Sequence, residues 1–315
     1  LWVPMLDGTE RAGLLRIGLD TGVVDDETLR RRLWSLSGLM GHIVMTKMAY
    51  SEHLRRLRGA GRMSAASTLM WQLLPPRTFA TREVVVTALL EPCERVAGDG
   101  YDYVVDDHEV DVAVFDGVGH DLKATHLTGL ALTAIRNARR AGVSDLVALA
   151  GHADELLAAG EAGRAQFATA VLARLDTRTG VLEYLLAGHP APLLFRQGHL
   201  VRELGCAPRL PLGVVEAGVD GRFTVREQLE PGDRVLLYTD GVTEARNADG
   251  EFFSEQRLVD FTERAELDGL PAPETLRRLA AAVLAHQGGH LQDDATLLMI
   301  DWSSDGPRRL LPTLS

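Results

Sequence analysis

The sequence predicts an α+β fold whose strands pair in antiparallel sheets. Short β-branched or apolar runs come in pairs, such as residues 167–176 and 181–187 around a Gly-containing loop, which is typical of a hairpin. Helical segments are grouped between such pairs rather than alternating with single strands, which argues against a doubly wound parallel sheet. The 315 residues are 46% hydrophobic and 24% charged, so the chain can bury a large core.

Residues 1–25 predict the tail of a truncated sensor domain or a small lid. Apolar stretches flank a turn at Asp7-Gly8, which indicates a hairpin, and two strands alone do not make a stable domain. This hairpin resembles the last strands of a GAF domain. Because the chain begins at Leu1 rather than at Met, we expect a missing upstream part.

Residues 26–74 predict a helical linker. Between residues 26 and 58, apolar residues recur at alternating four- and three-residue spacing over about four heptads, as in a coiled coil. The seam consists of Leu29, Leu33, Leu36, Met40, Ile43, Lys47, Tyr50, Leu54 and Leu57. One interpretation is a coiled coil that dimerises or transmits a signal; the other is an amphipathic helix packed on its own domain. A second short helix at 62–74 ends before Pro75-Pro76.

Residues 75–303 contain the predicted sheets, and residues 304–315 form a C-terminal tail. Strands are expected at 84–90, 110–115, 167–176, 181–187, 222–228, 234–238 and 295–300. Helices are expected at 122–140, 145–159 and 273–286.

Charge and cysteine content exclude several classes of protein. The net charge of −11 argues against nucleic-acid binding, which needs clustered Lys and Arg. The two cysteines, Cys93 and Cys206, form neither a disulfide framework nor a metal-binding spacing, which favours a reducing, cytoplasmic setting. No apolar run is long enough to span a membrane, so no membrane partner is expected.

The chemistry is indicated by aspartates that lie beside glycines or beside apolar strands. They are Asp99, Asp102, Asp116, Asp240, Asp293 and Asp294. An Asp-Gly pair after a strand is usually only a turn, and we interpret the pairs at 220–221 and 249–250 in that way. Converging carboxylates, however, repel one another unless a divalent cation lies between them. Oxygen ligands without His or Cys favour Mg²⁺ or Mn²⁺.

The order of these motifs resembles the SpoIIE/RsbU-type branch of the metal-dependent PPM serine/threonine phosphatases. The resemblance covers residues 74–302. The motifs, in order, are Gly98-Asp99-Gly100-Tyr101-Asp102, Asp116-Gly117-Val118-Gly119-His120, Phe167-Ala168-Thr169, Ala187-Gly188-His189-Pro190, Pro231-Gly232-Asp233, Thr239-Asp240-Gly241-Val242-Thr243-Glu244 and Asp293-Asp294-Ala295-Thr296.

The resemblance implies a sandwich of two antiparallel β-sheets flanked by α-helices, with two Mn²⁺ or Mg²⁺ ions at one edge. By similarity, Asp116 bridges both ions and the carbonyl of Gly117 is a further ligand. Asp240 and Asp293 complete the site of one ion, and Asp99 serves the other directly or through water. Asp116, Asp240 and Asp293 are the residues expected to be essential for catalysis.

Four further residues are expected around these ligands: Asp102, His120, Glu244 and Asp294. His120 either protonates the leaving oxygen or faces the start of the following helix. His189 is interpreted as a structural histidine at a strand turn. The sequence departs from the family pattern at Asp121, Leu186 and Ser254, where the family commonly has Gly, Asn and Gly.

The predicted function is therefore dephosphorylation of a protein serine or threonine. In the family that the chain resembles, the usual substrate is a STAS-domain anti-sigma factor antagonist. A homodimer through residues 26–58 is expected to relay a signal by moving the short helix at 62–74. The alternatives are an inactive dimeric scaffold of the same fold and, in a third class, a two-metal nuclease, which the acidic charge disfavours.

Overall fold

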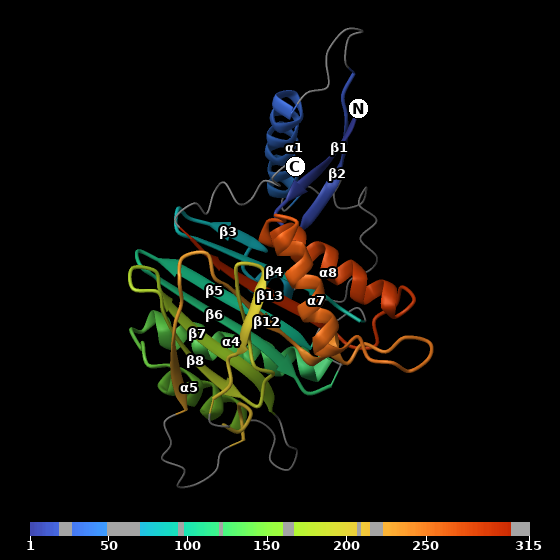
Figure 1. Ribbon diagram of the computed structural model, residues 1–315. Coiled ribbons are helices and arrows are strands. Elements are labelled where there is room, and N and C mark those ends of the chain that lie inside the picture. Colours follow the sequence, from blue (N-terminus) through green and yellow to red (C-terminus); the bar gives the residue numbers. More distant parts are fainter. Residues whose placement is uncertain are drawn as a thin grey trace.

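The structure is a computed structural model that describes residues 1–18, 27–48, 70–93, 98–119, 122–159, 167–206, 209–214 and 223–303, with only the backbone described at residue 27. Two antiparallel sheets form its centre (Figure 1). The first sheet has the strand order β10-β9-β12-β13-β4-β3, and the second has the order β11-β8-β7-β6-β5. The predicted sandwich of antiparallel sheets is confirmed.

The strand bounds follow the apolar runs of the sequence. They are β3 Thr78–Ala80, β4 Val84–Glu91, β5 Asp99–Asp106, β6 Glu109–Gly117, β7 Ala168–Asp176, β8 Val181–Ala187, β9 Leu193–Arg196, β10 His199–Glu203, β11 Thr224–Gln228, β12 Arg234–Tyr238 and β13 Ala295–Trp302. Each strand that the sequence predicts is present, within two residues at most of its ends. Strands β3, β5, β9 and β10 were not predicted.

Three apolar layers explain why the sheets stack. Alternate residues of β4, β13, β6 and β7 meet between the two sheets, where Tyr101 and Tyr184 are the largest fully buried side chains. The opposite face of the five-stranded sheet packs on α4 (Leu122–Arg140) and α5 (Leu146–Ala158). The opposite face of the six-stranded sheet packs on α7 (Ser254–Leu267) and α8 (Ala272–His286). Figure 1 shows these helices on the two outer faces.

The predicted helices at 122–140, 145–159 and 273–286 are confirmed. Asp145 is the N-cap of α5, because its carboxylate accepts a hydrogen bond from the N–H of Ala148 at 2.8 Å. The sequence analysis missed α7 and the four-residue helix α6 (Asp240–Thr243).

The N-terminal unit consists of the hairpin β1 (Trp2–Asp7) and β2 (Glu10–Arg16) with helix α1 (Glu27–Met48) packed against it. The predicted hairpin is confirmed. The turn of the hairpin contacts the sandwich: Thr9 Oγ1 donates to the carbonyl of Ala88 at 3.1 Å, and Glu10 pairs with Arg77 at 3.0 Å.

Helix α1 covers the first part of the predicted heptad seam. It contacts the hairpin through small residues: Ser37 Oγ donates to the carbonyl of Pro4 at 2.5 Å, and a Cβ on Gly41 would lie 2.5 Å from the carbonyl oxygen of Leu6. Seam residues Leu36 and Ile43 remain exposed. The predicted seam beyond residue 48 and most of the short helix at 62–74 lie outside the described residues, except that residues 70–73 are helical.

Among the residues that the structure describes, no helix is both long and apolar enough to cross a membrane.

Candidate metal centre

The first two candidate carboxylates meet because neighbouring antiparallel strands place them at one end of a hairpin. Strand β5 begins at Asp99 and β6 ends at Gly117, and the register pairs Asp99 with Asp116. Directly opposed residues of antiparallel strands have Cβ atoms about 5 Å apart. The two carboxylates therefore lie together at the same edge of the five-stranded sheet.

The other two candidate carboxylates come from the six-stranded sheet. Strand β12 ends at Tyr238, one residue before the N-cap residue Thr239 of α6, and Asp240 is the first residue of that short helix. Strand β13 begins immediately after Asp293 and Asp294. Because β12 and β13 pair in antiparallel register, the end of one lies beside the start of the other. The fold thus brings Asp240 and Asp293 to the same edge.

Two threonines connect the two sheets at this edge. The hydroxyls of Thr239 and Thr296 both donate to Oδ2 of Asp99, each at 2.7 Å. The N–H of Thr296 in turn donates to Thr239 Oγ1 at 3.0 Å. These buried hydrogen bonds occupy one oxygen of the Asp99 carboxylate and fix its orientation, which prepares the other oxygen for a ligand.

Asp294 fixes the backbone that precedes Asp99. Its buried carboxylate accepts hydrogen bonds from the N–H of Cys93 at 2.8 Å and from the N–H of Gly98 at 2.5 Å. The N–H of Asp294 donates to Asp293 Oδ1 at 2.8 Å. Asp294 therefore acts on the position of its neighbours, in agreement with its expected place around the ligands.

Two glycines permit the close approach of the chain segments. A Cβ on Gly241 would lie 1.9 Å from the carbonyl oxygen of Asp294, and a Cβ on Gly117 would lie 2.6 Å from the carbonyl oxygen of Ala124. Any larger residue at either position would push α6 away from β13, or β6 away from α4.

The electrostatics of the cluster disfavour four ionised carboxylates. Burial, together with the charges of Asp116 and Asp294, raises the pKa of Asp99 well above its usual range. Burial and the charges of Asp240, Asp293 and Asp294 raise the pKa of Asp116 to about 7. The pKa of Asp240 is also raised, by partial removal from water and by the charges of Asp293 and Glu244.

This donor set fits a hard divalent cation. The carboxylates supply only oxygen, and their mutual repulsion is the term that a bound dication removes. The thiol of Cys93 also reaches the cluster, because the ligand atoms of Cys93, Asp293 and Asp294 lie within 4.8 Å of one another. The sequence analysis did not place Cys93 here, because the two cysteines show no metal-binding spacing and only the fold brings Cys93 next to Asp294.

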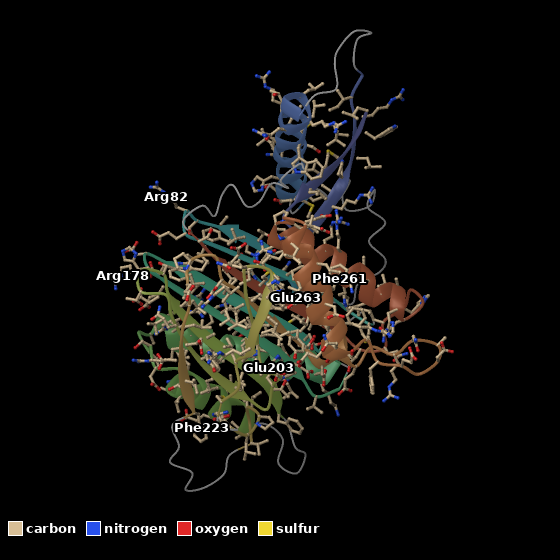
Figure 2. All side chains as sticks on the ribbon, in the orientation of Figure 1. Arg82, Arg178, Glu203, Phe223, Phe261 and Glu263 are labelled. Carbon is tan, nitrogen blue, oxygen red and sulfur yellow. The ribbon has the colours of Figure 1, made fainter. Side chains whose placement is uncertain are left out.

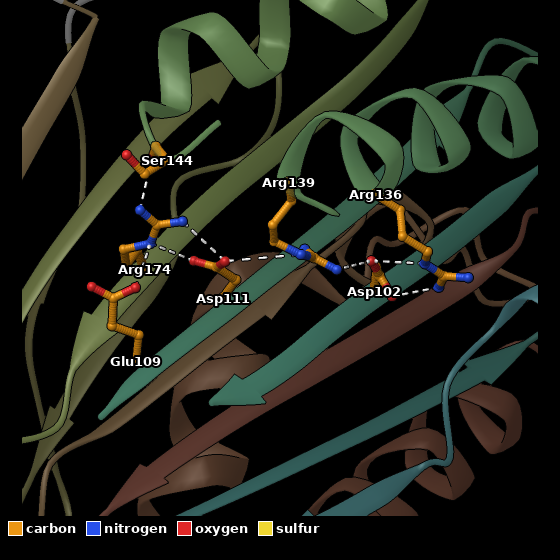
Figure 3. A network of polar contacts seen from close by, with 7 residues as sticks. All are labelled: Asp102, Glu109, Asp111, Arg136, Arg139, Ser144 and Arg174. Carbon is orange, nitrogen blue, oxygen red and sulfur yellow. Dashed lines mark hydrogen bonds and ion pairs between the residues drawn. The ribbon is translucent and has the colours of Figure 1, made fainter. Parts of the chain in front are cut away.

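Asp102 does not join this cluster, which corrects the expectation that it lies around the ligands. Because side chains alternate along a strand, Asp102 projects from the face of β5 opposite to that of Asp99. There Arg136 donates to both carboxylate oxygens, at 2.5 and 3.3 Å, and Arg139 donates at 3.0 Å. Figure 3 shows this network continuing through Asp111 to Arg174. Asp102 therefore anchors α4 on the sheet.

The remaining predicted residues have different surroundings. Glu244 is exposed at the C-cap of α6, and its N–H donates to the carbonyl of Asp240 at 2.7 Å. His120 lies outside the described residues. His189 is buried, its Nδ1 lies 2.7 Å from Thr169 Oγ1, and burial lowers its pKa to about 3. A neutral, buried His189 agrees with the structural role expected for it.

The departures from the family pattern are accommodated locally. Leu186 is buried in the core between the sheets. Ser254 has a φ of 67°, a left-handed conformation that glycine adopts without strain, which explains why glycine is common at this position. Asp121 lies outside the described residues.

A comparison with models of protein families identifies the family to which these motifs belong. The model of the SpoIIE family, described as stage II sporulation protein E, matches residues 106–303, which is more than half of the chain. The chain belongs to the SpoIIE family. The matched part includes Asp116, Asp240 and Asp293, whereas Asp99 precedes it.

Individual SpoIIE-type relatives agree with this membership. The chain is 24% identical over 284 residues to the phosphoserine phosphatase RsbU of Bacillus subtilis, covering 84% of this chain and 78% of RsbU. It is 25% identical over 246 residues to protein IcfG of Synechocystis sp. (strain ATCC 27184 / PCC 6803 / Kazusa), covering 68% of this chain but only 37% of IcfG. The match therefore spans little more than a third of that relative.

Among solved structures, the SiaA-PP2C domain of Pseudomonas aeruginosa has a TM-score of 0.65 and 27% identity. The match covers 76% of this chain and 94% of that domain. The SpoIIE-family chain therefore has the fold of the PPM phosphatases.

Sequence reasoning missed Thr239 and Thr296, which connect the candidate ligands. A signal for them is present in the printed sequence, because each threonine lies within three residues of a predicted ligand, Asp240 or Asp293. Only the tertiary structure shows that both hydroxyls point to Asp99.

Proposed function

We propose that this SpoIIE-family chain is a protein serine/threonine phosphatase that uses two Mn²⁺ or Mg²⁺ ions. The observation that carries the proposal is the convergence of the carboxylates of Asp99, Asp116, Asp240 and Asp293 from both sheets on one edge, where the pKa values of the first three are raised. A cluster of this kind is costly without cations, so it is typical of a site built to bind them.

Each of the proposed ligands has its own role in holding the two ions. By family resemblance, Asp116 and the carbonyl of Gly117 would be shared by the two ions, Asp240 and Asp293 would hold one ion, and Asp99 would serve the other. When bound, two such ions polarise a phosphate ester and activate a water molecule. Thr239 and Thr296 orient Asp99 through its Oδ2, so that this carboxylate needs no reorganisation when the substrate arrives.

We also propose that the substrate is a phosphoserine or phosphothreonine of a partner protein in a partner-switching pathway. RsbU, of which the match covers 78%, is a phosphoserine phosphatase. On the basis of the family resemblance, we propose a STAS-domain anti-sigma factor antagonist as the substrate. Incubating the phosphorylated antagonist with the chain and detecting loss of phosphate tests this directly.

Hydrolysis of p-nitrophenyl phosphate tests the chemistry. We expect turnover by the full chain with Mn²⁺ and loss of turnover with a chelator, with recovery when Mn²⁺ is added back. If the full chain is inactive, a chain that begins at Pro75 is the matched comparison. Activity only in the shorter chain indicates inhibition by the N-terminal unit, whereas inactivity of both chains favours the inactive scaffold.

We propose, in addition, that α1 mediates a homodimer. Leu36, Leu39 and Ile43 are 45, 57 and 49% exposed, and they form an apolar stripe on the helix face away from Ser37 and Gly41. The replacement of Leu36 and Ile43 by Asp should convert a dimer to a monomer in sedimentation velocity, because two charges would have to be buried in the seam. A concentration of about 100 µM is ample for a coiled coil to form. A wild-type chain that stays monomeric at that concentration contradicts the proposal.

A signal from this dimer has a direct route to the ligands. Residues 70–76 contact helix α4 and strand β5, which begins at Asp99: Arg136 of α4 donates to the carbonyl of Leu73 at 3.0 Å, and Tyr101 Oη of β5 donates to the carbonyl of Pro75 at 3.2 Å. These contacts support the proposed relay from the helical linker to the catalytic edge.

A further inference from the structure

A tightly built loop follows α6, and it carries Arg246 and Phe252 opposite each other. Residues 245–253, which we call the rim loop, fold back on themselves: the N–H of Phe253 donates to the carbonyl of Ala245 at 2.7 Å, and Arg246 and Phe252 form an antiparallel bridge. Oδ1 of Asn247 accepts hydrogen bonds from the N–H groups of Asp249 at 3.0 Å and Glu251 at 2.8 Å. The loop is therefore ordered by its own hydrogen bonds.

The rim loop lies next to the candidate metal centre. It begins directly after Glu244, the C-cap residue of the helix that starts at Asp240. The side-chain amide of Gln292, the residue before Asp293, donates to the carbonyl of Arg246 at 3.3 Å. On the other side of the loop, Nε2 of His286 lies 3.0 Å from the carbonyl oxygen of Glu251. These contacts fix the backbone of Arg246 beside the segment that carries Asp293.

The guanidinium of Arg246 is presented without an acidic partner. It lies 4.3 Å from the centre of the Phe252 ring, and Phe252 is 43% exposed. Within the part of the chain that the structure describes, no carboxylate forms an ion pair with Arg246, although the chain has 44 acidic and 33 basic residues. Arg257, by contrast, pairs with Glu251 of the same loop at 3.6 Å.

This geometry is suited to binding an oxyanion. Stacking on an aromatic ring fixes the plane of a guanidinium and leaves its N–H edge available for two parallel hydrogen bonds to a carboxylate. In a chain with a net charge of −11, an unpaired arginine at the edge of an acidic site offsets local repulsion of an acidic substrate.

We propose that Arg246, stacked on Phe252, binds a carboxylate side chain that flanks the phosphorylated residue of the protein substrate. This inference rests on the proposed phosphatase function and adds a substrate preference to it. We place the flanking carboxylate, rather than the phosphoryl group, on Arg246, because the Arg246 backbone is held by Gln292, the residue before Asp293, while its guanidinium stacks on Phe252 of the rim loop.

Three phosphoserine peptides of equal length, flanked by Glu, Gln or Lys, test the proposal. We expect Arg246→Ala to lower kcat/KM for the Glu-flanked peptide by about fivefold more than for the Gln-flanked peptide, the effect of one partly exposed ion pair. Arg246→Glu is expected to reverse the preference in favour of the Lys-flanked peptide. The control is Arg178→Ala, which removes another exposed arginine, from the turn between β7 and β8 (Figure 2).

The outcomes separate the inference from the phosphatase proposal. Equal effects of Arg246→Ala on all three peptides overturn the flank preference, and an equal loss on p-nitrophenyl phosphate as well would place the guanidinium on the phosphoryl group instead. If neither the full chain nor the chain that begins at Pro75 has turnover, the proposed function fails by itself. Fluorescence anisotropy of the labelled peptides then still tests the inference. If the binding preference among the differently charged peptides is not reversed by Arg246→Glu, the inference is overturned.

Discussion

Replacing Asp116 with Asn should reduce Mn²⁺-dependent hydrolysis of p-nitrophenyl phosphate by roughly 10³-fold, because loss of the proposed shared metal ligand would remove several kcal/mol of transition-state stabilisation. The substitution preserves the size and shape of the side chain and removes only its charge. A structural perturbation of β6 is therefore an inadequate explanation for the loss.

The same substitution should stabilise the metal-free protein. The pKa of Asp116 is raised to about 7 in the folded chain by burial and by Asp240, Asp293 and Asp294, whereas an unfolded Asp titrates near 4. The folded state consequently binds more protons than the unfolded state between these values, so the free energy of unfolding decreases as the pH rises through this window. Asn resembles the protonated form and avoids the penalty.

Chemical denaturation with a chelator measures this effect. At pH 8 we expect Asp116→Asn to be more stable than the wild type by about 2 kcal/mol, and the difference should vanish near pH 4. Asp107→Asn is the matched control, because it removes an exposed charge from the turn at the other end of the β5–β6 hairpin. Retention of Mn²⁺-dependent turnover by Asp116→Asn would show that Asp116 is not a ligand.

Replacing Gly241 with Ala should destabilise the fold by about 3 kcal/mol and lower turnover by about 10²-fold. A Cβ at this position would lie 1.9 Å from the carbonyl oxygen of Asp294, which is backbone and not a flexible side chain. Relief of the contact requires α6 to move away from the start of β13. Asp240 and Asp293 would then separate, because Asp240 is the first residue of α6 and Asp293 lies two residues before β13.

The free energy of unfolding, kcat and the Mn²⁺ concentration at half-maximal activity measure this prediction. The matched control is Gly151→Ala in α5, where an added Cβ meets no atom within 4 Å. Because alanine is the better helix former, that variant should be more stable than the wild type by about 1 kcal/mol. The same substitution is therefore expected to have opposite signs at the two sites. Equal stability of both variants would contradict the close packing of α6 on β13.

The sequence predicted helices and strands accurately where the spacing of apolar residues clearly followed one period, that of a helix or that of a strand. Strand β8 (Val181–Ala187), strand β12 (Arg234–Tyr238) and helix α4 (Leu122–Arg140) have the predicted bounds. Strand β5 was missed, because its first four residues include two aspartates and a glycine, which have low strand propensity. Neighbouring strand β6 and packing on α4 override that local preference.

Among the predicted site residues, a position at the end of a strand was a better guide to membership of the carboxylate cluster than a position inside a strand. Asp99, Asp116, Asp240 and Asp293 were selected because they lie at strand ends beside glycine or another aspartate, and the structure brings them to one edge. Asp102 lies only three residues after Asp99, yet it faces α4 and pairs with Arg136 and Arg139. An odd separation on a strand places two side chains on opposite faces.

The sequence by itself determined the fold class, the order of the principal strands and helices, and the identity of the acidic residues that define the family. These properties depend on local periodicity and on motifs that occupy consecutive positions. Only the tertiary structure decided that the hydroxyls of Thr239 and Thr296 converge on Asp99, that Cys93 reaches Asp294, and that Arg246 stacks on Phe252 with no ion pair to any described carboxylate. The contact between Cys93 and Asp294 joins residues that are 201 positions apart. The geometry of such contacts depends on how the two sheets stack, which no local sequence pattern encodes.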